Sequence, residues 1–370
     1  MSIYAHITGW GTAIPEKILT NEEISTMVDT NPEWIVERTG IRTRHIAAPE
    51  DTSATLGAAA SLKALEMANV PPSAVDLVIT ATSSPAYVFP ATASLIQDSI
   101  GATNAGAFDL SAACTGFIFA LNMATQLIRS GQIKTAVVVG AETLSRYVDW
   151  TDRGTCILFG DGAGAFVLQA SSVQGGVISS VMRSDGSGGD LLSVPASGSA
   201  MPATAKTIEQ GMHFIKMNGR EVFRFATRVM ARASEEAIEK AEWRLDQVEI
   251  IIPHQANKRI IEAAARGLKL PIEKFAINVD KYGNTSTASI PIAAVEMVEN
   301  GRLKKNDKTV LVGFGAGLTW GAVTVIWKEP FPADKSVNID FYQFLARIRS
   351  FLLRVARRIE GLIWGRKAPK

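Results

Sequence analysis

An internal repeat restricts the folds open to this chain more than any other feature of its sequence. Three pairs of segments correspond between the two halves: 74–84 with 247–257, 127–142 with 297–316, and 160–169 with 313–325. The first pair shares a short β-branched run, the second a helix end followed by such a run, and the third a glycine-rich segment at the start of a strand. We therefore expect two similar halves that pack about a pseudo-twofold axis.

Short β-branched runs and stretches of helical spacing alternate along both halves. TAVVVGAE at 135–142 and GAGAFVLQA at 162–170 are typical of strands, whereas TASLIQDSIG and GFIFALNMATQLIRSG are typical of helices. This alternation predicts an α/β fold with largely buried sheets. We expect an N-terminal half at 1–172, a C-terminal half at 173–328 and a tail at 329–370.

Composition and charge exclude several classes of protein. A net charge of +2 over 370 residues gives no basis for nucleic-acid binding. The two cysteines form no disulfide framework, and with the four histidines they show no metal-ligand spacing. No basic segment precedes an apolar one at the start, and no apolar run reaches about 18 residues. We expect a cytoplasmic protein without a metal ion, a signal peptide or a spanning helix.

Cys114 follows small residues and precedes an apolar helical stretch, in the segment DLSAACTGFIFAL. At the head of a buried helix, a thiol meets unpaired amide groups and the positive end of the helix dipole, which favour the thiolate. The alternative is a buried thiol that packs as a small hydrophobe. The other cysteine, Cys156, lies in a strand-like run and is interpreted as a core residue.

The repeat offers two partners for Cys114. Aligning Gly131 with Gly301 gives an offset of 170 residues, which pairs Cys114 with Asn284 in YGNTST. His254 lies at the end of a predicted strand, in IIIPHQAN. Taken singly, Asn284 is also an ordinary turn or cap residue and His254 an ordinary core histidine. If the halves pack symmetrically, however, all three polar groups meet at one buried centre.

Six motifs in order resemble one known family: DTNPEWIVERTGIRTRHIA, DLSAACTGFIFAL, DRGTCILFGDGAGA, IIPHQANKRII, YGNTSTASIP and GFGAGLTWGA. Over residues 1–328 the chain resembles the thiolase-fold condensing enzymes, and most closely the β-ketoacyl-(acyl carrier protein) synthase III family. The resemblance implies a five-layered αβαβα fold, a homodimer and a catalytic centre of Cys114, His254 and Asn284.

The implied reaction has two halves and needs no cofactor, because both thioesters are substrates. Cys114 attacks an acyl-CoA while the backbone amides of Cys114 and Ala316 hold the oxyanion. Malonyl-(acyl carrier protein) then loses carbon dioxide, and His254 and Asn284 donate hydrogen bonds to the resulting enolate. Its carbanion attacks the acyl-cysteine and gives a 3-oxoacyl-(acyl carrier protein).

The resemblance also implies substrate contacts along the motifs. The residues matching the CoA and pantetheine site are Trp34, Arg38, Arg153, Gly219, Phe223 and Asn257. The residues matching the carrier-protein site are Gln255, Ala256, Asn257, Lys258 and Arg259. Phe89 matches the residue that closes the acyl pocket of the partner subunit. Each position has an alternative as an ordinary surface or core residue, and the basic group as a solvated helix face.

Two other functions use the same residues. A condensing enzyme of secondary metabolism joins other acyl thioesters at the same centre. An inactive thiolase-like scaffold is a third possibility, against which the intact Cys114, His254 and Asn284 argue. The motif QANKR and the match throughout favour the enzyme that initiates type II fatty acid synthesis from a short primer such as acetyl-CoA.

The tail after residue 328 is not explained by the resemblance. From 339 to 370 it has eight basic and two acidic residues. With 3.6 residues per turn, ten apolar residues fall within a stripe of roughly 120°. They are Phe341, Phe344, Leu345, Ile348, Phe351, Leu352, Val355, Ile359, Leu362 and Ile363. We expect residues 339–364 to form an amphipathic helix that packs on its own dimer or another copy, lies on an anionic membrane surface, or fills a partner protein's groove.

Overall fold

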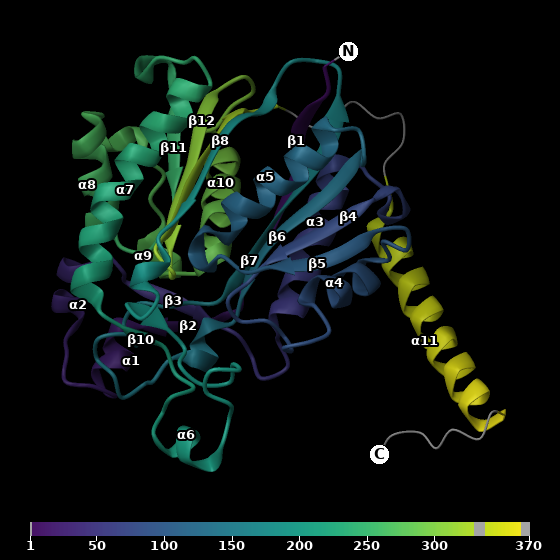
Figure 1. Ribbon diagram of the computed structural model, residues 1–370, viewed down its shortest axis with the longest axis horizontal. Helices are drawn as coiled ribbons and strands as arrows, with labels where there is room; N and C mark the ends of the chain where they lie inside the picture. The colour runs from purple at the N-terminus through teal and green to yellow at the C-terminus, as the bar shows by residue number, and fades with distance from the viewer. Residues whose placement is uncertain (1, 329–336, 364–370) are drawn as a thin grey trace.

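The computed structural model describes residues 2–328 and 337–363, and it has five layers. Two sheets lie roughly face to face with a pair of helices between them, and further helices cover both outer faces (Figure 1). This is the five-layered αβαβα arrangement expected from the sequence. The parts of the tail at 329–336 and 364–370 lie outside the described residues, including the last residue of the predicted helix at 339–364.

The first sheet belongs to the N-terminal half and has the strand order β1-β7-β6-β4-β5. Its strands are β1 (Tyr4–Ala13), β4 (Leu77–Ala81), β5 (Gly106–Leu110), β6 (Thr135–Glu142) and β7 (Gly162–Ser171). β4 runs parallel to β5 and β6, whereas β7 runs antiparallel to β6 and β1. All eight residues of β6 are buried, as its continuous apolar run predicts. Helices α3 (Ser53–Ala68) and α4 (Thr92–Ile100) cover the outer face.

The second sheet has the order β11-β12-β13-β8 and belongs to the C-terminal half. Its strands are β8 (Gly176–Ser184), β11 (Ile250–Pro253), β12 (Lys308–Gly315) and β13 (Thr319–Ile326). β11 is parallel to β12, and β13 is antiparallel to both of its neighbours. Helices α7 (Gly219–Lys240) and α8 (Lys258–Leu268) cover its outer face. The strands of each sheet therefore stay within the halves placed at 1–172 and 173–328.

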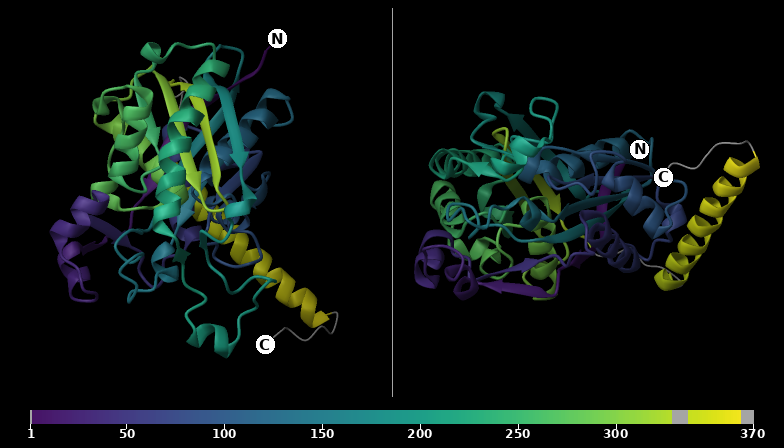
Figure 2. Two further views of the ribbon diagram at one scale, coloured as in Figure 1. Left: turned by 60° about the vertical axis from the view of Figure 1, so that its left-hand side comes forward. Right: turned by 90° about the horizontal axis from the view of Figure 1, so that it is seen from below.

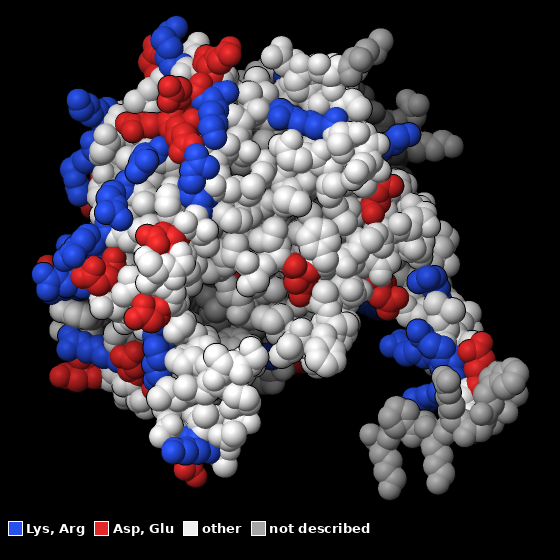
Figure 3. Space-filling model, in the orientation of Figure 1, with Lys and Arg blue, Asp and Glu red and all other residues white. Residues whose placement is uncertain are grey.

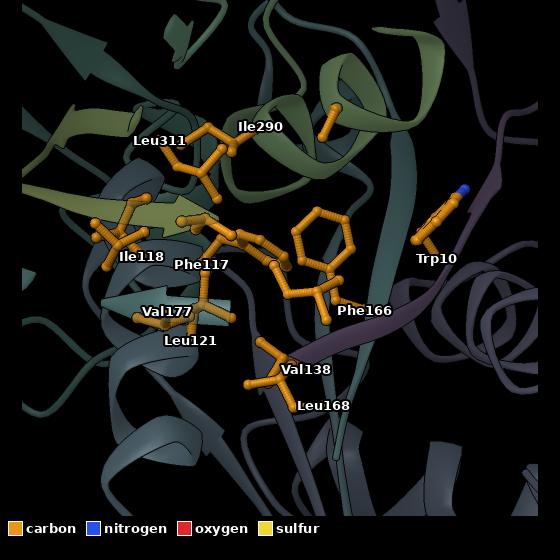
Figure 4. Close-up of a cluster of buried hydrophobic side chains, with 14 of the residues drawn as sticks. Trp10, Phe117, Ile118, Leu121, Val138, Phe166, Leu168, Val177, Ile290 and Leu311 are labelled. Carbon is orange, nitrogen blue, oxygen red and sulfur yellow. The ribbon is translucent and has the colours of Figure 1, made fainter. Parts of the chain in front are cut away.

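The two middle helices, α5 (Gly116–Arg129) and α10 (Ser289–Glu299), form the shared core between the sheets. Figure 4 shows Phe117 and Leu121 of α5 among side chains from both sheets and from α10. The rings of Phe117 and Phe166 meet edge to face with centroids 5.1 Å apart. Because one continuous core joins the halves, the head of each middle helix is fixed relative to the other half.

The equivalence of the halves corrects the predicted alignment. β4 and β11 begin at 77 and 250, β6 and β12 at 135 and 308, and α5 and α10 at 116 and 289, so each pair is offset by 173 residues. Since α10 is three residues shorter than α5, the glycines after these helices are offset by 170. The position equivalent to Cys114 is therefore Thr287, and the predicted pairing of Cys114 with Asn284 was wrong by three residues.

Smaller elements complete the described chain around these layers. Strands β2 (Lys17–Thr20) and β3 (Thr43–Ile46) pair, as do β9 (Leu192–Ser193) and β10 (Lys216–Met217). The remaining helices are α1 (Asn21–Ser25), α2 (Pro32–Thr39), α6 (Ala205–Glu209), α9 (Val279–Tyr282) and α11 (Ile339–Ile363). α11 contacts α4 and α3 and stands at the edge of the body (Figure 2).

The open edge of the first sheet carries exposed apolar side chains. β5 is the last strand there, and Phe108 on it is partly exposed. The adjoining loop exposes Tyr87, Val88 and Phe89 at 61%, 84% and 85%. The space-filling view shows few charged residues on this side of the molecule, whereas they crowd over the second half (Figure 3). An uncharged sheet edge with exposed aromatic residues suits pairing with another chain.

Candidate active site

Cys114 lies in the short 3-10 turn Ala113–Thr115, directly ahead of α5, as the sequence predicts. Its thiol is buried, and the preceding residue Ala113 has a φ of 47°, in the left-handed region that alanine rarely adopts. A Cβ on Gly315 of β12 would lie 2.7 Å from the Cys114 amide nitrogen. A glycine at 315 is thus what allows the second half to approach the Cys114 backbone this closely.

The protonation state of Cys114 differs from the expectation. Burial, with a smaller contribution from the nearby Glu142 carboxylate, raises the pKa of the Cys114 thiol to about 12. The Ser286 hydroxyl donates to Sγ at 3.3 Å and acts in the opposite direction. The predicted stabilisation of the thiolate at the helix head is therefore outweighed by desolvation in the unliganded site, and Cys114 is a thiol at neutral pH.

Asn284 reaches the same centre from the segment ahead of α10. Its Oδ1 accepts a hydrogen bond from the Ser286 amide at 2.9 Å, which turns the amide nitrogen Nδ2 toward the cavity. Ser286 has a φ of 48°, and the 173-residue offset makes it the equivalent of Ala113, with its φ of 47°. Each middle helix is therefore preceded, three residues before its start, by a residue with a strained positive φ, and such strain is typical of functional sites.

His254 follows the last residue of β11 and is 1% exposed. Its Nδ1 lies 2.7 Å from Ser289 Oγ, which in turn donates to the Ser286 carbonyl at 2.8 Å. In this arrangement Nδ1 carries the imidazole proton and Nε2 carries a lone pair. Nε2 is buried without a hydrogen-bond partner among the described residues. Burial lowers the pKa of His254 to about 3, so the ring is neutral over the physiological range.

Two cavities meet at Cys114. One of about 80 Å³ is lined by Cys114, His254 and Asn284 together, with Gly219 and Phe223 farther along it. The other, of about 250 Å³, also reaches the thiol and is lined largely by apolar side chains, together with several serines. Neither His254 nor Asn284 lines this second cavity. The thiol therefore lies where a smaller cavity that carries both predicted donors meets a larger cavity that carries neither.

Glu142 was missed in the sequence analysis and links the two halves beneath the site. It is fully buried at the end of β6 and accepts hydrogen bonds from Ser84 Oγ at 2.5 Å, Thr287 Oγ1 at 2.8 Å and the Ser83 amide at 3.0 Å. Burial raises its pKa. Because Thr287 stands at the head of α10, Glu142 positions the segment that carries Ser286. The signal in the sequence that indicates a role for Glu142 is its position as an acidic residue at the end of an otherwise apolar strand.

Ala316 lies beside the thiol, in the turn between β12 and β13, and lines the larger cavity together with Cys114. The positive φ angles of this turn fall on Gly317 and Leu318, at 70° and 45°. Alanine at 316 is therefore compatible with the backbone here, and its main chain remains a candidate oxyanion donor with the amide of Cys114.

At the outer end of the candidate CoA site, the Arg153 guanidinium lies 4.1 Å from the centre of the Trp34 ring, and that of Arg38 lies 5.7 Å from it. Two arginines against one indole give the charge and the aromatic face that a nucleotide needs. With Arg153 already stacked on the indole, an adenine must displace this guanidinium to bind between the two side chains.

Three of the predicted channel residues line one cavity. Gly219 and Phe223, in the first turns of α7, line the smaller cavity with Asn257. Asn257 caps α8 by accepting from the Arg259 amide at 2.9 Å, and its Nδ2 donates to the Arg38 carbonyl at 3.0 Å. Asn257 thus ties the helix of Arg38 to the channel wall.

One predicted carrier-protein residue was placed wrongly. Gln255 is 1% exposed, and its amide bonds the backbone of Pro253, Ala276 and Asn278. It fixes the segment after β11 and presents no surface to a partner. Ala256 lines the smaller cavity, whereas Lys258 and Arg259 are exposed on α8 beside the channel entrance.

Phe89 is almost fully exposed and lines neither cavity of its own chain. No group of three or more His, Cys, Asp or Glu side chains within 2–328 and 337–363 is arranged to hold a metal ion.

Ser286 gives a first testable prediction. Replacing Ser286 with alanine removes the hydrogen bond that stabilises the Cys114 thiolate, so the thiol pKa rises further. We expect alkylation of Cys114 by iodoacetamide at pH 8 to slow by about tenfold, the size of one hydrogen bond to a charged group. Ser289→Ala is the matched control, because Ser289 contacts His254 and not Cys114. Equal slowing in both variants would contradict this role.

The chain folds into two related halves that form five layers in the order αβαβα. A buried cysteine at the head of a helix of one half lies beside a histidine and an asparagine of the other half. This combination defines a thiolase-fold condensing enzyme. Residues 108–186 match the family model described as 3-oxoacyl-(acyl-carrier-protein) synthase III, and residues 238–327 match its C-terminal part. The chain belongs to the β-ketoacyl-(acyl carrier protein) synthase III family, and it is an acyltransferase of the condensing type.

Relatives support this membership over nearly their whole length. The synthase III of Roseiflexus sp. is 50% identical over 327 residues, which are 88% of this chain and 99% of that relative. The solved synthase III of Aquifex aeolicus is 44% identical, with a TM-score of 0.81 over 87% of this chain and 100% of that one. A priming β-ketosynthase of a polyketide pathway is 35% identical, with a TM-score of 0.82 over 89% of this chain and 98% of that one.

Proposed function

We propose that this enzyme condenses an acyl-CoA primer with malonyl-(acyl carrier protein) and so initiates type II fatty acid synthesis. The products are a 3-oxoacyl-(acyl carrier protein), CoA and carbon dioxide. The observation that carries the proposal is the position of Cys114 between two cavities, only one of which is lined by His254 and Asn284. The larger cavity suits the acyl group, and the smaller one, which carries both enolate donors and residues of α7 and α8, suits the pantetheine arm of each substrate in turn.

In the first half-reaction, Cys114 attacks the thioester carbon of the acyl-CoA. The new S–C bond forms as the thiol proton leaves, and the departing CoA sulfur takes that proton away. The amides of Cys114 and Ala316 hold the carbonyl oxygen while it carries negative charge. The strained turn at Ala113 and the close approach of Gly315 fix these amides before the substrate arrives.

In the second half-reaction, the carboxylate of malonyl-(acyl carrier protein) leaves as carbon dioxide, and its bonding electrons form an enolate. Asn284 Nδ2 donates to the enolate oxygen from an orientation fixed by the Ser286 amide. His254 donates from Nε2 in its other tautomer, which Ser289 supports by rotating its hydroxyl to donate to Nδ1. The Ser286 carbonyl keeps the Ser289 amide as a partner in that state. The carbanion then attacks the acyl-cysteine, and the released thiolate takes a proton from solvent.

Labelled acetyl-CoA tests the proposal directly. We expect one acetyl group per chain on Cys114, located by mass spectrometry of the peptide, and its release as 3-oxobutanoyl-(acyl carrier protein) when malonyl-(acyl carrier protein) is added. A panel of acyl-CoA chain lengths then defines the primer, and the apolar cavity of about 250 Å³ predicts a preference for short chains. An enzyme that remains unlabelled by every acyl-CoA tested would refute the proposal.

The polyketide-type alternative uses the same centre and is separated by the same panel. Selective use of acyl thioesters other than acetyl-CoA and its short homologues would favour that alternative. The third possibility, an inactive scaffold, is disfavoured because the enolate donors and the thiol all line one cavity.

The proposal includes assembly and location. The chain acts as a homodimer in which Phe89 enters the partner's acyl pocket, and acyl carrier protein docks at Lys258 and Arg259 by charge attraction. It requires no cofactor. It works in the cytoplasm, with the helix within 339–364 in contact with a membrane surface or a partner helix. The structure has no helix, within the residues it describes, that is long and apolar enough to cross a membrane.

A further inference from the structure

The C-terminal helix α11 docks on its own subunit through a narrow face of small or short side chains. Ile339, Ala346 and Ser350 are buried on this face. Ser350 Oγ donates to Asp98 of α4 at 2.6 Å. Gly101 ends α4 with a φ of 80°, and a Cβ there would lie 3.1 Å from the Ala346 side chain. Arg349 Nη1 also lies 3.9 Å from Asp98 Oδ1, so the docked face is held by polar contacts to Asp98 and by a close backbone approach.

The apolar stripe of α11 is on the opposite side of the helix. At 3.6 residues per turn, its centre lies about 180° from the docked face. Seven large apolar side chains of the stripe are 40–61% exposed: Phe341, Phe344, Leu345, Ile348, Phe351, Leu352 and Ile359. Packing of the stripe against its own subunit, one of the arrangements expected from the sequence, is therefore not what the structure shows. The side chains of Leu362 and Ile363 are outside the described part.

Four of the five arginines of the helix flank this stripe, Arg357 lies on the opposite side, and all five are exposed. The helix carries Arg347, Arg349, Arg354, Arg357 and Arg358, against Asp340 near its start and Glu360 near its end. The side views show α11 standing clear of the catalytic body along much of its length (Figure 2). The relatives' own lengths are covered almost completely without this segment, so the condensing fold does not depend on it.

We propose that α11 lies on an anionic membrane surface, with its apolar stripe at the boundary of headgroups and acyl chains and its arginines against lipid phosphates. A convex apolar stripe bordered by arginines has the shape and charge that such a surface binds. A second copy of α11 fits poorly, because pairing the stripes in either direction brings the central arginines of the two helices together. The inference deepens the peripheral location proposed above and does not depend on the condensation chemistry.

Sedimentation with vesicles tests the proposal on the full chain. We expect binding to vesicles of phosphatidylglycerol and phosphatidylcholine that weakens as salt is raised, and little binding to phosphatidylcholine alone. A chain ending at Glu329 is expected to lose vesicle binding and to retain acylation of Cys114 by acetyl-CoA. Equal vesicle binding by the two chains would overturn the proposal, whereas failure of both to acylate would count against the catalytic proposal alone.

Adjacent leucines provide a matched pair of variants. Leu352 is in the stripe and Leu353 lies outside it, and both are partly exposed, so neither substitution should unfold the enzyme. We expect Leu352→Glu to weaken binding to anionic vesicles by about tenfold or more and Leu353→Glu to change it by less than about threefold. Equal losses would refute the orientation of the helix. A different outcome is that Leu352→Glu changes the oligomeric state and the full chain does not bind vesicles. In that case a second copy of the chain covers the stripe, and the membrane proposal fails.

Discussion

Replacement of Cys114 with alanine is expected to lower condensation by at least about 1,000-fold, because the serine hydroxyls near the site, such as that of Ser286, are far weaker nucleophiles than the thiol. Slow decarboxylation of malonyl-(acyl carrier protein) should persist, since the enolate donors are side chains of the other half. The measurements are covalent labelling by acetyl-CoA and carbon dioxide release. The other buried cysteine supplies the control: Cys156 lies in a separate apolar cluster, so Cys156→Ala should keep both activities. Acetyl label on the Cys114→Ala protein would show that the nucleophile is elsewhere.

Substitution of Asn284 with aspartate is expected to leave acylation within about tenfold of the wild type and to lower decarboxylation by more than about 1,000-fold. Loss of one oxyanion donor alone costs roughly 2.7–4 kcal/mol. The new carboxylate also puts a negative charge where the enolate forms, in a water-poor site. Aspartate can still accept the Ser286 amide, so the local backbone is retained.

His254→Ala and Asn284→Ala separate charge from the loss of a donor. Each should keep acylation and lower decarboxylation by about 100- to 1,000-fold, less than Asn284→Asp. Rapid-quench labelling and carbon dioxide release measure the two steps independently. If either variant loses self-acylation as strongly as condensation, the division of roles between the thiol and the enolate donors is wrong.

The strands and helices of this protein could be predicted from local sequence. TAVVVGAE at 135–142 forms β6 over the same residues, and the stretch beginning at Gly116 forms α5. The physical reason is that β-branched runs and helical spacing act between near neighbours. The repeat also gave the two-half architecture, but its exact register depended on α10 being three residues shorter, which an ungapped comparison cannot detect.

The sequence analysis named Cys114, His254 and Asn284 as members of one centre, but it did not predict the hydrogen bonds that connect them to their neighbours. Ser286 and Ser289 follow Asn284 in the motif NTSTAS. Only the hydrogen bonds of the folded chain show that Ser286 contacts the thiol and Ser289 the imidazole. The polar run at a buried helix head was the available signal. Gln255 belonged to a motif that also contains exposed residues, and sequence alone does not distinguish its buried side chain from theirs.

The sequence by itself determined the two halves, the reactive residue types and the amphipathic tail, because each is encoded in composition and spacing along the chain. Tertiary structure decided the pKa of Cys114 and the direction in which the α11 stripe faces, because both depend on the residues packed around them. Burial raised the pKa of Cys114 against the effect of its helix head, because desolvation of a charge depends on every atom packed around it. The direction of the α11 stripe was likewise decided by Asp98 and Gly101, residues far from it in sequence that bind its opposite face.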